Sequence, residues 1–390
     1  MPKTVILSAT RTPVGKLGGG LSSMKATELG GLAIEEALKR ADVSGDQVDH
    51  VVMGTVLQAG QGQIPSRQAQ INGGIPKEVS SETINKVCAS GVRAVGMLDQ
   101  AIRAGDVEVG VGGGMESMSN APYMLPQARF GYRMGDGKML DAMLTDGLTN
   151  PFSGKHMAQE ASEVAAEFEM TRADMDKWSL RSHERTFAAW DDGRMDDVFP
   201  VTVKGRKGDT VVEMDESPRR DSSLESLSKL PPIFLKDGSH TAGNAPGVND
   251  GAGALVVASD EWADANGKEA IAEIVSQAAM ANEFHILGTT PARAAMKALD
   301  KAGLQPSDID LWEINEAFAS VTLHSMRMLG IDEDKVNVNG GAVAIGHPIG
   351  ASGARIIGTL VHELRRRGGG YGCACICSGG GQGDAVIVKV

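Results

Sequence analysis

The stretch Asn85–Arg93, which reads Asn-Lys-Val-Cys-Ala-Ser-Gly-Val-Arg, lies where one sequence pattern gives way to another. A short apolar strand pattern ends near Val87, and apolar residues at helical spacing then continue to Ile102. The pattern predicts that Cys88 lies at the start of a helix, where free N–H groups and the helix dipole favour a thiolate. The alternative is a buried cysteine that packs as a small hydrophobic residue.

The second half of the chain repeats the sequence around this cysteine. Ala89–Arg93 reads Ala-Ser-Gly-Val-Arg, and Ala351–Arg355 reads Ala-Ser-Gly-Ala-Arg. Two further pairs of segments align in the same order: residues 37–49 with 298–310, and residues 251–257 with 383–388. The repeat predicts two similar halves, whose Ala-Ser-Gly helices occupy equivalent places and approach closely through their small residues. A pseudo-twofold axis between the halves would then bring Cys88 near His347, which precedes the second helix.

Strands and helices alternate on both sides of a central segment of different composition. Before this segment, the expected elements are Thr4–Ala9, Leu29–Arg40, Asp49–Val56, Ile64–Ile71 and Val107–Val111, the last closed by Gly112–Gly114. After it, they are Asn249–Ala258, Ala270–Ala278, Pro291–Ala302, Ile309–Ile314, Ala351–Arg367, Gly372–Cys377 and Ala385–Val390. Such alternation is typical of an α/β sheet with helices packed on its faces. The expected units are a first half of residues 1–118 plus 249–268, an inserted loop-rich domain of residues 119–248 that helps to hold a ligand, and a second half of residues 269–390.

The bulk composition excludes several classes of protein. The chain has 390 residues and a net charge of −12, so it lacks the basic character that non-specific nucleic-acid binding needs. No apolar run approaches the roughly 20 residues of a membrane span, and residues 1–7 resemble the start of a strand rather than a signal peptide. Four cysteines in so long a chain do not suggest a disulfide framework. We therefore expect a cytoplasmic protein with neither a nucleic-acid nor a membrane partner.

Three further polar residues stand beside glycine-rich turns or strand ends. His347 lies in the loop Gly340–Gly350 ahead of a helix, which suits a base or an oxyanion donor better than the surface or core role of most histidines. Asn315 follows an expected strand and is either a helix N-cap or the anchor of a catalytic water. Cys377 borders the turn Gly379–Gly381, where an acid/base thiol would meet bare backbone N–H groups.

Cys373, Cys375 and Cys377 alternate along one expected strand, which raises the question of a metal site. Successive residues on one face of a strand are about 6.8 Å apart. Thiolates that share one tetrahedral zinc ion, each about 2.3 Å from it, lie only about 4 Å from each other. An extended segment therefore cannot place these thiols on one ion, and no metal is expected. Cys373 and Cys375 are interpreted as packing residues.

Five segments together resemble the thiolase family, and the resemblance covers nearly the whole chain. These segments are Asn85–Gly91, Gly112–Ser119, Asn315–Ala319, Gly340–Gly353 and Cys377–Gly383. The resemblance implies an α/β thiolase fold, five-layered αβαβα, built from two duplicated halves with an inserted loop domain. It also implies an acyltransferase whose substrate is a coenzyme A thioester and which needs no other cofactor.

The resemblance further implies a role for each candidate. Cys88 would attack an acyl-CoA thioester and hold the acyl group. His347 would help to deprotonate Cys88 and, with a water on Asn315, would stabilise one oxyanion. Cys377 would move a proton at the α-carbon of the second acetyl-CoA or at the leaving thiol. The backbone N–H groups of Cys88 and Gly379 would form the other oxyanion hole.

Within the family, Asp146–Leu148 followed by His156 and Met157 resembles the biosynthetic branch, which interconverts acetyl-CoA with acetoacetyl-CoA and CoA. The substrate contacts implied by this resemblance are Leu148, His156, Met157, Arg219, Ser226, Ala242, Pro246, Ala317 and Phe318. The stretch Arg129–Met143 resembles the loop through which that branch forms homotetramers.

The sequence departs from the pattern of this branch at three positions, and alternatives to it stay open. Ala158 follows Met157 where the family usually has glycine, Pro246 replaces a serine, and Thr290 replaces a glycine. A 3-ketoacyl-CoA thiolase of broader chain length in fatty-acid β-oxidation is the first alternative. A non-catalytic acyl-CoA or lipid carrier and a decarboxylating ketoacyl synthase of related fold are the others.

Overall fold

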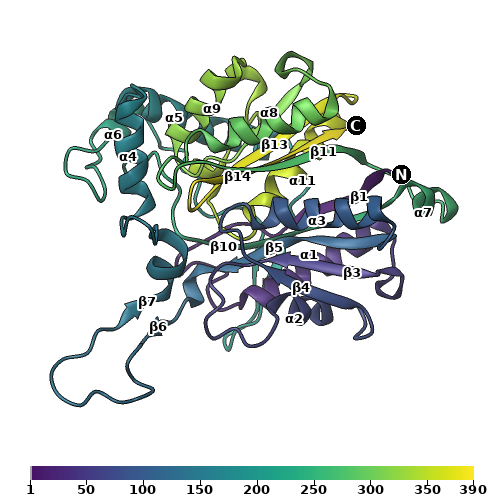
Figure 1. Ribbon diagram of the computed structural model, residues 1–390, viewed down its shortest axis with the longest axis horizontal. Coiled ribbons are helices and arrows are strands. Elements are labelled where there is room, and N and C mark those ends of the chain that lie inside the picture. Colours follow the sequence, from purple (N-terminus) through teal and green to yellow (C-terminus); the bar gives the residue numbers. More distant parts are fainter. Residues whose placement is uncertain (1) are drawn as a thin grey trace.

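The computed structural model describes residues 2–390. The fold is built around one sheet of ten strands (Figure 1). The strands of this sheet are β1 Thr4–Arg11, β2 Gly15–Lys16, β3 His50–Gly54, β4 Ser80–Ile84, β5 Val109–Ser117, β10 Asn249–Ser259, β11 Ala272–Ala281, β12 Leu311–Ile314, β13 Tyr371–Ser378 and β14 Gln382–Lys389. Their order is β12-β13-β14-β11-β1-β10-β5-β3-β4, and β2 pairs with β10. The first half of the chain supplies one end of this order and the second half supplies the other.

Helices cover both ends of the sheet on both faces. The main helices are α1 Ala26–Ala41, α2 Pro65–Asn72, α3 Ser90–Ala104, α8 Thr290–Ala302, α9 Ala319–Leu329 and α11 Ser352–Arg366. The first pair, α1 and α2, packs on the outer face of β1, β3, β4, β5 and β10, whereas α8 packs on β11, β13 and β14 with α9 beside it. Between the two halves lie α3 and α11, which contact strands of both (Figure 1). The two halves of the sheet therefore form two β layers, with α3 and α11 between them and the other main helices outside. The predicted five-layered αβαβα arrangement is confirmed.

The two central helices approach each other as closely as the repeat predicted. Gly91 of α3 faces Gly353 of α11, and a Cβ atom on Gly353 would lie 2.2 Å from the backbone nitrogen of Val92. A Cβ atom on Gly91 would lie 2.6 Å from the backbone nitrogen of Ala354. Glycine at both places therefore allows backbone to meet backbone between the halves.

The glycine run Gly112–Gly114 was expected to close a strand, and that prediction is wrong. The run lies inside β5, whose residues are all buried. A Cβ atom on Gly113 would lie 2.1 Å from the carbonyl oxygen of Gly253, and one on Gly114 would lie 1.9 Å from that of Gly350. The strand consists of glycine there because the backbone of the adjacent strand β10 and that of the loop at Gly350 leave no room for a Cβ atom.

The segment between β5 and β10 forms the inserted part of the molecule. Its elements are β6 Tyr123–Met124, β7 Leu140–Asp141, a π-helical turn Met143–Leu148, α4 Met157–Glu167, α5 Arg172–Asp191, β8 Val201–Val203, β9 Thr210–Val212 and α6 Leu224–Ser228. The strands β6 and β7 are the base of a long arm that projects from the body of the molecule (Figure 1). The helix α5 packs against α9 and the short α10, Ala342–Ile345, so the insertion reaches the second half.

The remaining elements are α7 Asp260–Ala265 and the short 3-10 turns Gly45–Gln47, Met118–Asn120, Pro306–Asp308 and Glu333–Lys335. None of the helices described within residues 2–390 combines the length and the apolar character that a membrane crossing requires.

Candidate active site

A tight turn, rather than a strand, presents Cys88. The strand β4 ends at Ile84, so the prediction that it continues to about Val87 is wrong. Val87 has φ of 43°, in the left-handed region, and its N–H donates to Asn85 Oδ1 at 2.9 Å. This turn sets Cys88 two residues before the start of α3. The side chain of Cys88 is buried, with a relative exposure of 4%.

The protonation state of Cys88 differs from the sequence-based expectation. Burial, with a smaller effect from Cys377, raises the pKa of the Cys88 thiol well above its ordinary value. The prediction that the helix start favours a thiolate is therefore wrong for the free protein, because the loss of water on burial outweighs the hydrogen bond that favours the thiolate. Cys88 is a neutral thiol that needs a base before it can act as a nucleophile.

His347 has the tautomer and the protonation state of such a base. Its Nδ1 lies 2.6 Å from Ser352 Oγ, and that hydroxyl donates its one hydrogen to the carbonyl oxygen of Pro348 at 3.0 Å. The network therefore assigns the ring hydrogen to Nδ1, which leaves the lone pair on Nε2. This Nε2 is buried and has no hydrogen-bond partner within residues 2–390. Burial, and then the charge of Arg355, lowers the pKa of His347 to about 3, so the ring is neutral.

The loop of His347 is held rigidly by the first half of the chain. The backbone N–H of His347 donates to Asn249 Oδ1 at 2.8 Å, and Asn249 Nδ2 donates to the carbonyl oxygen of Gly15 at 2.9 Å. Gly346 has φ of 112°, which favours glycine over any other residue. The imidazole is thus fixed at its ring by Ser352 and at its backbone by Asn249.

Cys377 is the second-to-last residue of the strand β13 and lies beside a turn that packs against the loop of Cys88. Burial raises the pKa of the Cys377 thiol to about 12. A Cβ atom on Gly379 would lie 3.3 Å from Val87 Cγ2, so the turn after Cys377 touches the loop of Cys88. The hydroxyl of Ser378 also donates to the carbonyl oxygen of Lys86. The turn after Cys377, from the second half of the chain, therefore packs against the loop of Cys88, from the first half.

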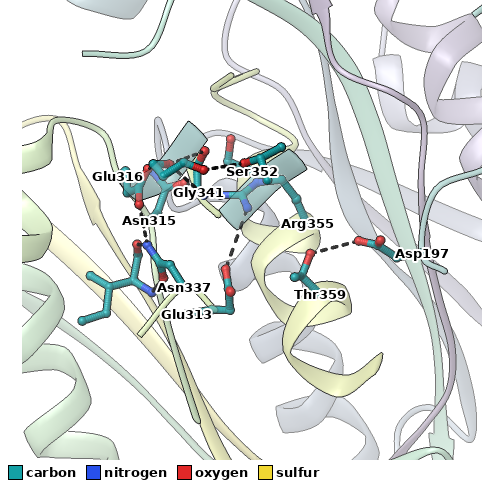
Figure 2. A network of polar contacts seen from close by, with 12 residues as sticks. Asp197, Glu313, Asn315, Glu316, Asn337, Gly341, Ser352, Arg355 and Thr359 are labelled. Atoms are coloured by element: carbon teal, nitrogen blue, oxygen red, sulfur yellow. Dashed lines mark hydrogen bonds and ion pairs between the residues drawn. The ribbon is translucent and has the colours of Figure 1, made fainter. Parts of the chain in front are cut away.

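Asn315 is not the helix N-cap that its position suggested as one alternative. The helix α9 begins at Ala319 with Phe318 as its N-cap residue, and Asn315 lies in the preceding loop. Asn315 Oδ1 accepts a hydrogen bond from Arg355 Nη2 at 3.0 Å (Figure 2). Its Nδ2 is buried and has no partner within residues 2–390, which leaves both of its N–H groups available as donors.

One apolar cavity of about 290 Å³ receives most of the predicted site. Cys88, His347, Cys377 and Gly379 all line it, so residues from both halves meet there as the repeat suggested. The predicted substrate contacts that also line it are Leu148, His156, Met157, Ala242, Pro246, Ala317 and Phe318. Asn315 is not among the lining residues, although Ala317 two positions later is.

Arg219 and Ser226 lie in a second cavity of about 450 Å³, away from the thiols. The two cavities share a wall made of Ala242, Ala245, Gly247 and Val248. A long ligand could therefore bind along both of them, with a charged end near Arg219 and a reactive end near Cys88.

Sequence reasoning missed a buried carboxylate that supports the site. Glu116 in β5 accepts hydrogen bonds from the backbone N–H groups of Val56 at 3.0 Å, Leu57 at 3.1 Å and Gly350 at 2.9 Å. It joins the loop after β3 to the loop that carries His347. Burial raises the pKa of Glu116 to about 7. The sequence signal was a single glutamate near a run of glycines. A glutamate within a buried strand is rarely fully buried unless it has a partner, so this residue could have been interpreted as one that binds neighbouring groups.

A second missed carboxylate, Glu316, follows Asn315 and fastens the inserted segment to the second half. Its oxygens accept hydrogen bonds from Trp178 Nε1 at 2.9 Å and Ser182 Oγ at 2.8 Å in α5. They also accept from Asn337 Nδ2 and from the backbone N–H of Val343, each at 2.9 Å. The loop of Asn315 is therefore fixed from both sides.

Sequence reasoning also missed several apolar walls of the first cavity. They are Met118, Met143, Leu144, Ile233, Phe234, Val248, Leu287 and Ile349. Phe234 stacks on His156 with ring centroids 3.7 Å apart. Cys373 and Cys375 lie in the core of the second half, and residues 2–390 contain no cluster of three potential metal ligands.

Comparison with known proteins places this geometry in a family. The model of the thiolase N-terminal domain matches residues 4–261, and that of the thiolase C-terminal domain matches residues 268–390. An acetyl-CoA acetyltransferase of Syntrophomonas wolfei is 48% identical over 99% of both chains, and one of Cupriavidus necator is 48% identical over 100% of both. The crystal structure of the Bacillus anthracis acetyl-CoA acetyltransferase matches with a TM-score of 0.97 at 40% identity, over 100% of this chain and 99% of that one.

Proposed function

The chain belongs to the thiolase family, and from that premise we propose that it catalyses the reversible condensation of two acetyl-CoA molecules to acetoacetyl-CoA and CoA. The observation that carries this proposal is the meeting of Cys88, His347 and Cys377 in one apolar cavity. Two thiols and a neutral imidazole are the groups that acyl transfer and carbon–carbon bond formation require. The names of the related proteins support the same reaction.

The first half-reaction moves an acetyl group to Cys88. His347 Nε2 takes the thiol proton as Cys88 Sγ attacks the thioester carbonyl carbon, and the new oxyanion is held by Nε2–H and by a water on Asn315 Nδ2. Collapse of the tetrahedral species breaks the bond to the CoA sulfur. The leaving sulfur takes the proton of Cys377, so CoA departs as a thiol and Cys377 becomes a thiolate beside imidazolium.

The second half-reaction forms the carbon–carbon bond. The Cys377 thiolate takes a proton from the α-carbon of a second acetyl-CoA, and the backbone N–H groups of Cys88 and Gly379 bind the enolate oxygen. The carbanion attacks the acetyl-Cys88 carbonyl carbon and expels the Cys88 thiolate, which regains its proton from His347. The pKa of Cys377, raised to about 12, makes its thiolate a strong base once it has formed.

Coenzyme A is the substrate carrier, and no resident cofactor or metal is needed because the thioester already activates the acyl group. Arg219 and Ser226 would bind its nucleotide end in the second cavity, where an arginine suits a phosphate. Leu148, Met157 and Phe318 would pack against the pantetheine arm and the acyl group. The segment 119–248 thus serves as the coenzyme A-binding domain.

The test is thiolysis of acetoacetyl-CoA. The purified protein, given acetoacetyl-CoA and CoA, should form acetyl-CoA, and Cys88→Ala should neither form it nor accept an acetyl group. Absence of acetyl-CoA with the unaltered protein would favour a non-catalytic carrier. Higher activity on 3-ketohexanoyl-CoA than on acetoacetyl-CoA would assign the broader 3-ketoacyl-CoA thiolase, and activity with malonyl thioesters alone would assign a ketoacyl synthase.

We also propose a cytoplasmic homotetramer. The arm between β6 and β7 presents bare apolar side chains, with Phe130 90% and Met134 96% exposed, which suits a contact with another copy. The four cysteines are free thiols, as expected in a reducing compartment. Light scattering on the intact chain and on one with the arm shortened at its tip tests the assembly: the intact chain should be a tetramer, and the shortened one a dimer.

A further inference from the structure

We infer that Arg355 is a positioning residue that holds the amide of Asn315 in the orientation the reaction needs, an inference that rests on the proposed function. Arg355 Nη2 donates to Asn315 Oδ1 at 3.0 Å (Figure 2). An amide whose oxygen is engaged in this way keeps its nitrogen free, so Nδ2 remains the group that can bind a water or an oxyanion. Without that bond, the amide could rotate by half a turn and present an acceptor, which would repel an oxyanion.

The start of α11 supports both groups that stabilise the first oxyanion. Ser352, the first residue of the helix, binds His347 Nδ1 at 2.6 Å, and Arg355 binds Asn315 from one turn later. Residues three apart lie on the same face of a helix. One rigid element therefore orients the imidazole and the amide together, and of these two groups Arg355 forms a hydrogen bond only with the amide.

Arg355 is poorly paired for a group buried so deeply, which argues against a role in stability. Its partner Glu313 lies 3.8 Å from Nη1, beyond hydrogen-bond distance, and Nε and Nη1 have no hydrogen-bond partner within residues 2–390 (Figure 2). Burial raises the pKa of Glu313 to about 8, which weakens the negative charge that this carboxyl offers to Arg355. A buried cation with so little compensation lowers the stability of the fold.

The internal repeat supplies a matched control. Arg93 occupies the corresponding place in α3, where its Nη2 donates to Gln100 Oε1 at 2.9 Å at an exposed position. The same Ala-Ser-Gly-x-Arg sequence thus directs one arginine to Gln100 and the other to Asn315. Arg93→Met removes an arginine from the equivalent helical position without touching the cavity of Cys88.

The first experiment compares Arg355→Met with Arg93→Met in acetoacetyl-CoA thiolysis. Arg355→Met should lower kcat by roughly 10²- to 10³-fold, the effect of losing one oxyanion donor. Its KM for CoA should stay within about threefold, because the second cavity is unchanged. Its thermal midpoint should not fall, and Arg93→Met should keep wild-type kcat. An unchanged kcat in Arg355→Met, or an equal loss of kcat in Arg93→Met, would overturn the inference.

A double-mutant cycle tests whether Arg355 acts through Asn315. Asn315→Ala combined with Arg355→Met should have the kcat of Asn315→Ala alone, whereas losses that multiply would show that the arginine acts elsewhere. Arg355→Lys, which keeps a charge and donors, should recover at least about tenfold over Arg355→Met. If the Met variant does not fold, the Lys variant takes its place in the same cycle with the same two outcomes. Lack of thiolysis in the unaltered protein would refute the proposed function and not this assignment.

Discussion

The role of Ser352 gives a prediction whose size follows from the contacts of His347. The substitution Ser352→Ala removes the oxygen that accepts the Nδ1 hydrogen of His347 at 2.6 Å. That hydrogen bond matters most when the ring becomes imidazolium, because hydrogen bonds to charged groups are stronger than neutral ones. His347 reaches that state only as Cys88 is acetylated, so the loss should fall on the acetylation step.

The magnitude comes from the burial of the site. His347 and Ser352 are 6% and 0% exposed, so water cannot readily replace the lost partner. A buried donor left without a partner costs about 1–3 kcal/mol. At 1.36 kcal/mol for each factor of ten, acetylation should slow by roughly 5- to 150-fold. Without the Ser352 hydroxyl, the neutral ring of His347 is also no longer fixed in one tautomer, which slows acetylation further.

Single-turnover acetylation by acetyl-CoA, quenched at successive times and followed by mass spectrometry of the intact chain, measures this step. Ser276→Ala is a matched control, since the hydroxyl of Ser276 is also buried and donates to the carbonyl oxygen of Ala298 at 2.7 Å, far along the chain from His347. Both variants should lose some stability, but only Ser352→Ala should acetylate slowly. Equal acetylation rates in the two variants would refute the assignment of Nδ1 to Ser352.

Three other predictions concern the second thiol, the helix crossing and pH. Cys377→Ala should still acetylate Cys88 but lose condensation by at least about 10²-fold, as expected for a missing acid/base group; normal turnover would remove Cys377 from the mechanism. Gly353→Ala places a Cβ atom 2.2 Å from a backbone nitrogen of α3, so thermal unfolding should show a clear loss, of about 1–3 kcal/mol or more; an unchanged midpoint would contradict the close crossing. Burial lowers the pKa of His240 to about 4, so its contribution to stability is present above about pH 6.5 and lost as pH falls toward 4. Burial raises the pKa of Glu313 to about 8, so stability should instead rise as pH falls through 8. Chemical unfolding across pH should therefore find maximum stability near neutral or slightly acidic pH, and a steady rise to pH 9 would contradict the assignment of Glu313.

Much of this site could be predicted because its residues stand at positions that the sequence marks. Cys88 and the loop of His347 precede the two Ala-Ser-Gly helices, and the repeat alone indicated that they would face each other. Cys377 was marked by the glycines that follow it. The close helix crossing was also readable, since only small residues at Gly91 and Gly353 allow it.

The missed features depend on burial, which cannot be predicted from a local sequence pattern. The helix start predicted a thiolate at Cys88, but this residue is only 4% exposed, and burial raises its pKa and so favours the neutral thiol. The glycines of β5 looked like a turn because the backbone of Gly350 that presses on them is distant in sequence. Glu116 and Arg355 act on loops from other parts of the chain, so their roles became visible only with the fold.

In the proposed reaction, Cys88 carries the acetyl group between two coenzyme A thioesters. The most direct measurement uses acetyl-CoA with an isotopically labelled acetyl group, followed by quenching, peptide mapping by mass spectrometry and a chase with unlabelled CoA. We expect label on the peptide of Cys88 alone, in a thioester that CoA discharges as labelled acetyl-CoA. Label on Cys377 instead, or label on Cys88 that CoA cannot remove, would contradict it.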